Sequence, residues 1–409
     1  MVYLMAIPKT RFLKKNLLLL LSVLALASTV AAQSPDPEQY RQRSLQWSEG
    51  MNSRGLAEPF KGITTNGSVE QNLFEIRSTG ISTAPVSNAA EAFLASLNAD
   101  QRERIVFGVD DDEWRKWANQ HIYYREGISF DELNPAQREA ALAMLGASLS
   151  ARGLQLSRDI MRLNSTLGEL NGNNFVEYGE GKYWISIMGT PSTSEPWGWQ
   201  LDGHHLNLNY FILGDQVVMT PAFWGSEPAV ATSGEFAGTA IMEDEQRYGL
   251  AMINTLDAGQ RAKAILESNK TGNNIMTQAF SDNVLLDYAG IRVSEFTPAQ
   301  KQQLLRLVGI YVGNMRETHQ GIRMAEIEQH LDDTWFAWIG DTEDDSVFYY
   351  RIQSPVVLIE FDHETPVGLT HMYARGVPYK EHIHSIVRTP NGNDYGKDLL
   401  RQHYLAHPH

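Results

Sequence analysis

Two short histidine-containing segments carry the side chains best suited to bind a metal ion. His204 and His205 are adjacent, whereas His382 and His384 are separated by one residue. Residues two apart on a strand project from the same face, so His382 and His384 would present two imidazoles together. Imidazole suits zinc, copper, iron or nickel, and the chain has no cysteine to supply a thiolate ligand. The sequence therefore predicts a divalent transition metal, zinc or copper, with His382 and His384 as ligands and His204 and His205 as further candidates.

Carboxylates and arginines accompany the histidines in the second half of the chain. Glu360 and Asp362 share one face of an apolar strand, and we expect Asp362 to bind the metal or to orient an imidazole. Glu360 is a candidate catalytic residue or a further ligand, and Arg351 and Arg388 are candidates for holding an anionic substrate group. A structural alternative stays open, because a buried Glu360 needs a partner and either arginine could provide one.

These residues support two main classes of function, and a metal-free hydrolase that uses a carboxylate as base stays open as a third. A metal with an open coordination position lowers the pKa of bound water, which predicts a metal-dependent enzyme of hydrolytic type. Alternatively, the histidines only form hydrogen bonds, and the protein is a non-catalytic structural or binding module whose aromatic hairpins receive a small molecule or peptide. The chain has neither the Gly-X-Ser-X-Gly turn of serine hydrolases nor a phosphate-binding P-loop.

The elements that must position these residues are predicted by a block that occurs twice, 151 positions apart. Residues 183–209 and 334–360 align without a gap and match Trp184 with Trp335. Each block begins with an aromatic and β-branched segment, continues through a turn-rich segment and ends in a longer apolar segment, expected at 197–210 and 347–361. The sequence therefore predicts a β-hairpin in each half.

Helix starts also recur in pairs. Asn98, Asn134, Asp257 and Thr297 are each followed three residues later by Gln, which is the pattern of a capping box. The shared period indicates an internal duplication. We therefore expect an α+β fold in which two related helix-helix-hairpin halves, about 89–245 and 246–409, pack as one domain of antiparallel strands with flanking helices. Packing about a pseudo-twofold axis would bring His205 close to His382 and His384.

The N-terminal region is expected to lie outside that domain. Residues 1–32 have a basic start, a 14-residue apolar run and the small residues Val30, Ala31 and Ala32, which is typical of a secretory signal peptide. The run is shorter than the roughly 20 residues needed to span a bilayer, although an uncleaved anchor is the alternative. We expect export to a periplasm or to the extracellular space, with no membrane association after cleavage. Residues 33–88 are rich in Ser, Pro and Gly and are expected to form an irregular lead-in.

Composition narrows the range of partners. The formal net charge of −15 disfavours nucleic acid, because binding phosphates needs clustered Lys and Arg. An exported chain without cysteine must be stabilised by its core rather than by disulfides, and 43% hydrophobic residues can form one. No feature of the sequence indicates an oligomeric state.

Several segments together resemble one protein family. The sequences are PWGWQLDGHHL at 196–206, TPAFWGSEP at 220–228, YYRIQSP at 349–355, LIEFD at 358–362, His-Ile-His at 382–384 with Arg388, and DYGKDLL at 394–400 with His403 and Tyr404. They are similar to the DUF3500 family, and the resemblance extends from about residue 89 onward. It implies one shared fold and a set of recurring polar residues, without specifying a reaction. The chain differs from the family pattern after Asp362, where His363 replaces the usual Asn and a longer segment leads to His382.

Overall fold

The computed structural model describes residues 35–407. The expected signal peptide at 1–32 lies outside the described residues, as does His409. Within 35–407, none of the helices combines the length and the apolar character that crossing a bilayer requires.

The described residues form ten α-helices and 13 strands. The helices are α1 (Pro37–Gly55), α2 (Ala84–Ser96), α3 (Ala99–Ile105), α4 (Pro135–Ser148), α5 (Ala151–Leu170), α6 (Glu243–Asn254), α7 (Ala258–Ala264), α8 (Pro298–Val312), α9 (Glu317–Gln329) and α10 (Lys397–Ala406). The strands are β1 (Val106–Phe107), β2 (Ile128–Ser129), β3 (Tyr183–Met188), β4 (Trp197–Gly203), β5 (Leu206–Leu213), β6 (Gln216–Val218), β7 (Ala222–Ser226), β8 (Ile265–Glu267), β9 (Ile291–Arg292), β10 (Trp335–Gly340), β11 (Phe348–Gln353), β12 (Leu358–His363) and β13 (Ile383–Arg388).

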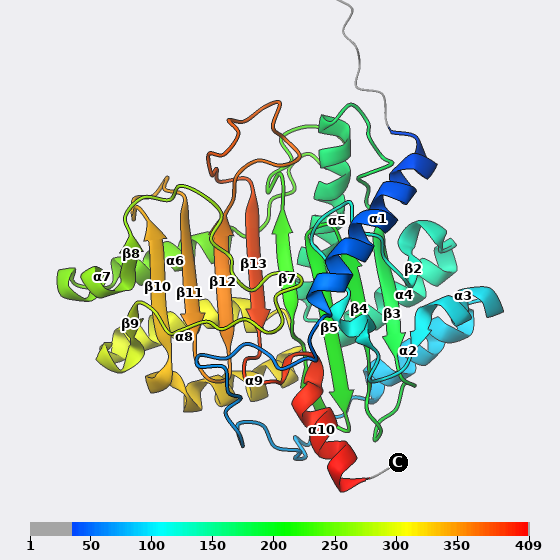
Figure 1. The fold of residues 1–409 in the computed structure, drawn as a ribbon, viewed down its shortest axis with the longest axis horizontal. Coiled ribbons are helices and arrows are strands. Elements are labelled where there is room, and N and C mark those ends of the chain that lie inside the picture. Colours follow the sequence, from blue (N-terminus) through cyan, green and yellow to red (C-terminus); the bar gives the residue numbers. More distant parts are fainter. Residues whose placement is uncertain (1–34, 408–409) are drawn as a thin grey trace, which may run out of the picture.

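All of these strands belong to one mixed sheet, which Figure 1 shows face on. Its order is β1-β3-β4-β5-β7-β13-β12-β11-β10-β8, and β2, β6 and β9 pair with β3, β5 and β10. The long strands are antiparallel to their neighbours, whereas the short strands β1 and β8 run parallel to β3 and β10. The two halves of the chain therefore lie side by side and meet where β7 pairs with β13.

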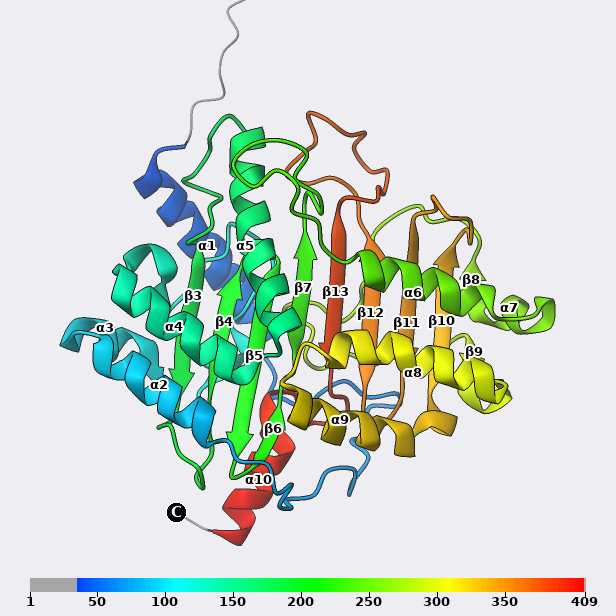
Figure 2. The same cartoon turned by 180° about the vertical axis from the view of Figure 1, so that it is seen from behind.

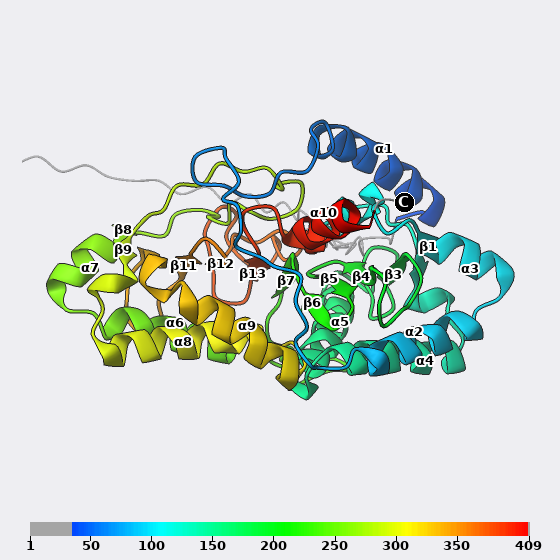
Figure 3. The same ribbon diagram turned by 90° about the horizontal axis from the view of Figure 1, so that it is seen from below.

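Helices cover one face of this sheet. Figure 2 shows α2, α4 and α5 in front of the first half of the sheet and α6, α8 and α9 in front of the second. Figure 3 shows α1 and α10 on the opposite side of the sheet. The residues that point toward the helices are apolar and belong to the main core, and they include Trp199, Leu201, Leu208 and Tyr210. Alternation along each strand explains this, because every second side chain faces the same layer.

The opposite face of the sheet is largely polar although it is buried. Gln200, Asn209, Arg351 and Glu360 are at most 5% exposed. Neighbouring strands and the chain that crosses this face satisfy them: Gln200 donates to Asn209 of β5 and to the carbonyl of Trp114 in the short 3-10 helix 112–115. Buried polar groups need such partners, so this face fixes the course of the loops that cross it.

The two halves correspond in the register of their strands. In the first half Trp184 pairs with Asp202 and Gln200 pairs with Asn209. In the second half the residues 151 positions later pair in the same way, Trp335 with Gln353 and Arg351 with Glu360.

The helices follow the same order in each half. The sequence α2-α3-β1-β2-α4-α5 precedes the first strands, and α6-α7-β8-β9-α8-α9 precedes the second. All four expected capping boxes are present, at Asn98, Asn134, Asp257 and Thr297. Their glutamines also meet in pairs, because Gln137 donates to Gln101 at 2.8 Å and Gln300 donates to Gln260 at 2.7 Å.

Two expectations about local structure are wrong. The lead-in at 33–88 contains helix α1. The Asp36 side chain caps this helix by accepting from the Gln39 amide, and proline occupies the first helical position. Segments 197–210 and 347–361 are each two strands, because the chain turns at His204 and His205 between β4 and β5 and at 354–357 between β11 and β12. His205 has a φ of 97°, which a continuous strand does not allow.

Candidate metal centre

Three imidazoles converge at one end of the central strands. His205 lies in the turn between β4 and β5, His384 lies on β13, and His382 immediately precedes β13. Nε2 of His384 is 3.1 Å from Nε2 of His382 and 3.1 Å from Nε2 of His205. One ligand atom from each residue lies within 4.8 Å of the others. The expected meeting of histidines from both halves is therefore confirmed.

The junction of the two halves brings these rings together. Gly225 of β7 pairs with His384 of β13, and the Gly225 amide donates to the His205 carbonyl at 2.8 Å. A Cβ atom on Gly225 would lie 2.3 Å from the Ile383 carbonyl oxygen and 3.2 Å from the His384 ring. Glycine thus allows the backbones and the ring to approach this closely.

Oxygen acceptors beside Nδ1 leave Nε2 as the free nitrogen of two of the rings. Nδ1 of His382 is 2.7 Å from the Thr365 carbonyl oxygen, and Nδ1 of His384 is 2.9 Å from Oε1 of Glu364. Both partners are acceptors, so a proton on each Nδ1 would leave the two Nε2 lone pairs facing each other as ligand atoms. Facing lone pairs repel unless a cation lies between them. The 3.1 Å separation is close to the roughly 3.3 Å edge of a tetrahedron with metal–nitrogen bonds of about 2.05 Å.

Burial favours the neutral, metal-binding form of His205 and His382. His205, His382 and His384 are 5%, 1% and 4% exposed. Desolvation, together with the neighbouring imidazoles, lowers the pKa of His205 well below its ordinary value and also lowers that of His382. Burial alone would raise the pKa of Glu364, but its charge interaction and hydrogen bond with His384 outweigh this and lower it. A carboxylate therefore faces Nδ1 of His384.

His204 flanks the three rings without joining them. Its ring stacks on that of His205 with centroids 3.9 Å apart, and its Nδ1 is 2.8 Å from Oδ1 of Asn164. The ring of His121 follows at 5.4 Å from that of His204, and burial lowers the pKa of His121 to about 4. His204 thus serves the packing of the site, and His121, which the sequence analysis did not single out, extends the row of rings.

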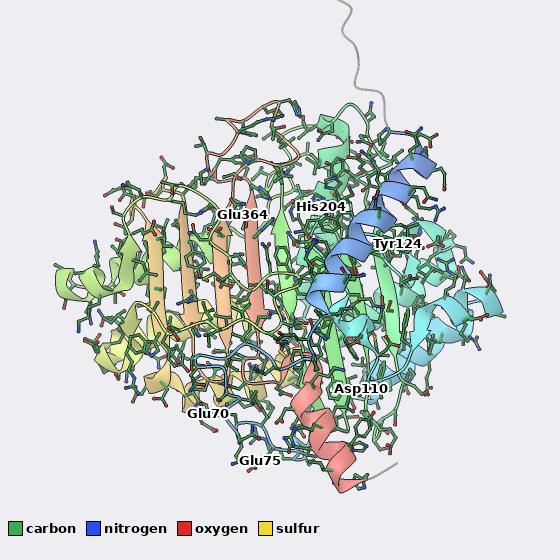
Figure 4. All side chains as sticks on the ribbon, viewed as in Figure 1. Glu70, Glu75, Asp110, Tyr124, His204 and Glu364 are labelled. Carbon is green, nitrogen blue, oxygen red and sulfur yellow. The ribbon has the colours of Figure 1, made fainter. Side chains whose placement is uncertain are left out.

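The contacts of Asp362 are with Lys270 and Asn274 and not, as expected, with an imidazole. Its Oδ1 is 2.9 Å from Nζ of Lys270, and its Oδ2 accepts from the Asn274 amide at 2.6 Å. The carboxylate beside His384 is instead Glu364, which Figure 4 labels near the upper end of the central strands together with His204. Extending the alternation of Glu360 and Asp362 by two residues would have identified Glu364.

Glu227 is a second carboxylate that the sequence analysis missed. It is 2% exposed and accepts from the amides of Val367 and Gly368, at 3.0 and 2.6 Å, and from the Tyr379 hydroxyl at 2.8 Å. Its Oε1 lies 4.0 Å from Nδ1 of His382. Glu227 therefore fixes the segment 364–381 beside the three imidazoles.

The candidate catalytic residues are engaged in structural contacts. Glu360 accepts hydrogen bonds from the amides of Met276 and Thr277, and also from the Thr277 and Tyr349 hydroxyls. Arg351 donates to the Asp287 carbonyl at 3.1 Å. These contacts attach the segment 276–287 to the polar face of the sheet.

Arg388 is an internal ionic anchor. It is fully buried and lies 3.0 Å from Asp282 and 3.1 Å from Asp394. It also donates to the Thr277 carbonyl and lies over the Trp117 ring at 5.6 Å. The expected ion pair between Glu360 and an arginine is therefore wrong for the described residues: amides and hydroxyls hold Glu360, whereas the Asp287 carbonyl accepts from Arg351 and two aspartates pair with Arg388.

Comparison with known protein families gives a match over most of the chain. A family model described as "Protein of unknown function (DUF3500)" matches residues 79–397, which is more than half of the 409-residue chain. No curated protein and no solved structure matches it.

Proposed function

The chain belongs to the DUF3500 family, and we propose that it is an exported metal-binding protein with His205, His382 and His384 as ligands. The observation that carries the proposal is the convergence of three Nε2 atoms, two of them on rings whose Nδ1 atoms face oxygen acceptors. An acceptor at the second nitrogen is the usual arrangement around a metal-bound histidine, because it fixes both tautomer and ring orientation.

The donor set favours zinc or copper as the metal. Three neutral imidazoles without thiolate suit borderline transition metals, whereas magnesium and calcium prefer oxygen ligands. Three protein ligands also leave the fourth position of a tetrahedral zinc site open, which is the pattern of catalytic rather than structural zinc. A metal held in this way lowers the pKa of a bound water, and this supports a hydrolytic enzyme as the finer proposal.

Metal content tests the binding proposal. Protein expressed without an affinity tag should contain about one equivalent of metal by inductively coupled plasma mass spectrometry. His384→Ala should lose it, because one of three ligands is removed. His330→Ala is the matched control, since His330 follows α9 far along the chain from the site. Substoichiometric metal in both wild type and His384→Ala would refute the proposal.

One observation favours a non-catalytic alternative. The groups expected to assist catalysis, Glu360, Arg351 and Arg388, are occupied by contacts with the segment 276–287 and its surroundings. In this second proposal the metal or the histidine network stabilises a binding or structural module. Assays with activated esters and peptides separate the two: metal-dependent turnover that His384→Ala abolishes supports the enzyme, and binding without turnover supports the module.

The proposal that the protein is exported rests on the sequence pattern at 1–32, and a separate experiment tests it. We propose that cleavage follows Ala32, because Val30, Ala31 and Ala32 are small residues at the end of the apolar run. Mass spectrometry of the mature protein recovered from a bacterial periplasm or culture medium should give an N-terminus at Gln33. An intact N-terminus in the cell pellet would contradict the proposal.

We also propose that the two halves arose by duplication of one ancestral unit. The support is the identical order of helices, the equal register of the strand pairs and the paired glutamines of the capping boxes. Other family members should then keep a near-constant offset between the two strand blocks. An offset that varies freely within the blocks themselves would contradict the proposal.

A further inference from the structure

The candidate metal centre is closed to solvent. His205, His382 and His384 are at most 5% exposed. Two cavities among the described residues, of about 330 and 470 Å³, have none of these rings among the residues that line them. A hydrated metal ion or a substrate therefore needs a movement of the surrounding chain to reach the three Nε2 atoms.

The loop 365–381, which connects β12 to β13, lies beside these rings and has little packing of its own. Figure 1 shows the loop extending beyond the ends of these two strands. Val367, Met372 and Val377 are 59%, 53% and 55% exposed, and within 366–378 only Leu369 and two prolines are buried. A segment with few buried apolar contacts opens at a lower free energy than the strands that it joins.

Hydrogen bonds hold the two ends of this loop together. The Glu364 amide donates to the His382 carbonyl at 2.8 Å, and the Tyr379 amide donates to the Glu364 carbonyl at 3.1 Å. The Ala229 amide donates to the Glu381 carbonyl at 2.8 Å, which attaches this end of the loop to the chain after β7. The residues between the two ends could therefore move without unfolding β12 or β13.

Glu227 attaches the body of the loop to the rest of the molecule. Its carboxylate accepts from the amides of Val367, Gly368 and Leu369, at 3.0, 2.6 and 3.3 Å, and from the Tyr379 hydroxyl at 2.8 Å. Donors from both ends of the loop thus meet at one buried carboxylate. Hydrogen bonds to a carboxylate are roughly twice as strong as those between neutral groups, so this contact strongly favours the closed position.

One apolar side chain adds to this attachment. Leu369 is 1% exposed and packs against Leu167 of α5 and Tyr178, in a small cluster separate from the main core. Glu227 and Leu369 are therefore a polar and an apolar point of attachment, and each can be removed without the other.

The loop and its attachment are in contact with the ring of His382. The Thr365 carbonyl oxygen lies 2.7 Å from Nδ1 of His382, and Oε1 of Glu227 lies 4.0 Å from the same atom. The Tyr379 ring lies 6.4 Å from the His382 ring, between centroids. Opening of the loop would uncover this imidazole, and closing would bring the covering groups back beside it.

We infer that the loop 365–381 is a lid over the candidate metal centre and that Glu227 is the positioning residue that holds it closed. The inference rests on the proposed metal site and adds that metal and substrate enter and leave when the lid opens. Weakening the attachment should therefore speed both association and dissociation of zinc. The ratio of the two rates should change little, because the closed form stays predominant with and without metal.

Stopped-flow measurements of zinc exchange with the full mature chain test the inference. Dissociation is followed after mixing zinc-loaded protein with an excess of a chromogenic chelator, and association after mixing metal-free protein with zinc and a zinc indicator. Glu227→Gln should raise both rate constants by about 10- to 100-fold, because it removes the charge that strengthens these hydrogen bonds. The zinc affinity should change by less than about threefold.

A second variant and a matched control accompany this measurement. Leu369→Ala weakens the lid without changing a polar group near the rings, and it should raise both rate constants by at least about tenfold. Asp215→Asn is the control, because Asp215 also accepts from two amides and a hydroxyl, those of Thr79, Gly80 and Ser78. Asp215 follows the end of β5 that lies away from the metal centre, so both rate constants should stay unchanged.

Hydrogen exchange measures the opening of the lid without metal. The peptide 365–381 should exchange faster in Glu227→Gln than in the wild type, and at the wild-type rate in Asp215→Asn. Equal exchange in Glu227→Gln and the wild type would overturn the role of Glu227.

The kinetic outcomes separate the lid from the metal site. Zinc binding by the wild type with the same rate constants in Glu227→Gln and Leu369→Ala would overturn the lid and leave the metal site standing. Weaker zinc binding in Glu227→Gln without faster association would also overturn it, because Glu227 would then support a ligand directly. A wild type that binds no zinc would refute the proposed function and the lid with it.

Discussion

The imidazole of His384 is held from both sides. Its Nδ1 faces the Glu364 carboxylate, and its Nε2 faces the other two rings. Glu364 also accepts from the side-chain amide of Asn273, which fixes the carboxylate itself. Orientation of the central ring therefore depends on one residue that would not touch the metal.

Glu364→Gln should weaken metal binding while leaving the fold intact. A neutral amide orients the ring less strongly and makes the imidazole a poorer donor, so we expect a loss of about 10- to 100-fold in zinc affinity. Competition titration against a chromogenic chelator measures it, and circular dichroism checks folding. Glu326→Gln, at the other end of the strands, is the control. Equal zinc affinity in wild type and Glu364→Gln would show that the carboxylate does not support the ligand.

Asp394 should make stability depend on pH. Burial raises the pKa of Asp394 from 3.8 to about 6, although Arg388 opposes the shift. Between about pH 4 and pH 6 the folded chain then binds more protons at this residue than the unfolded chain, so the free energy of unfolding falls as pH rises. Across this window the wild type should lose about 3 kcal/mol relative to Asp394→Asn, which cannot ionise.

Urea unfolding of wild type and Asp394→Asn at pH 4 and pH 7 measures this difference. Titrating groups that do not interact with Asp394 contribute equally to both proteins and cancel in the comparison. A difference between the two proteins that stays constant from pH 4 to pH 7 would contradict the raised pKa.

At the scale of elements, local signals in the sequence were sufficient for the helix starts and insufficient for the strand ends. Each capping box consists of residues three apart, so the chemistry that starts the helix lies within one turn. The turn at His204 and His205 has no comparable local signal. A positive φ is uncommon for any residue other than glycine, and the pairing of β4 with β5 and the approach of β7 enforce it at His205. Helix α1 was missed because its cap, Asp36 followed by Pro37, lies in a polar segment without apolar periodicity.

The stability of the fold should depend strongly on two glycines, one before each of the short strands β2 and β9. Gly127 and Gly290 have φ values of 80° and 88°, and a Cβ atom would lie 2.3 Å from the Ile185 carbonyl oxygen and 2.1 Å from that of Phe336. Alanine at either position combines backbone strain with a clash against backbone. Gly67, with a φ of 84° and open space around it, reports strain alone.

We therefore expect Gly127→Ala and Gly290→Ala each to cost about 1–3 kcal/mol more than Gly67→Ala. Denaturant unfolding followed by tryptophan fluorescence measures the three values. Similar costs at all three positions would mean that the sheet can move away from the added methyl group.

For the whole molecule, the repeat predicted that histidines of both halves would meet, because an equal register on both sides of β7 and β13 leaves few other arrangements. It did not predict how the polar face of the sheet is used. Glu360 and Arg388 bind the segment 276–287, which is distant in sequence and carries no recognisable pattern. Pairings of this kind depend on the position that a loop adopts in the folded chain. Neither the composition of the chain nor the alternation of side chains along a strand predicts that position.

Removing the metal should lower the thermal stability of the entire chain. A ligand that binds only the folded state stabilises it by RT ln(1 + [L]/Kd), about 2.7 kcal/mol at 100 times Kd. Differential scanning calorimetry with zinc and with a chelator should therefore give a higher melting temperature with zinc. His384→Ala should melt at the same temperature in both conditions, and a chelator effect of equal size in this variant would assign the change to another site.

The metal-binding candidates belong to two stretches of chain, which are joined in the sheet where β7 pairs with β13. A polypeptide opened within the exposed segment 232–235 would carry His205 on one fragment and His382 with His384 on the other. Neither fragment would hold a complete set, so tight zinc capture would appear only after the fragments had associated. Zinc binding would then indicate that the fragments had reassembled. The zinc affinity would measure how closely the native pairing of the two parts of the sheet is restored.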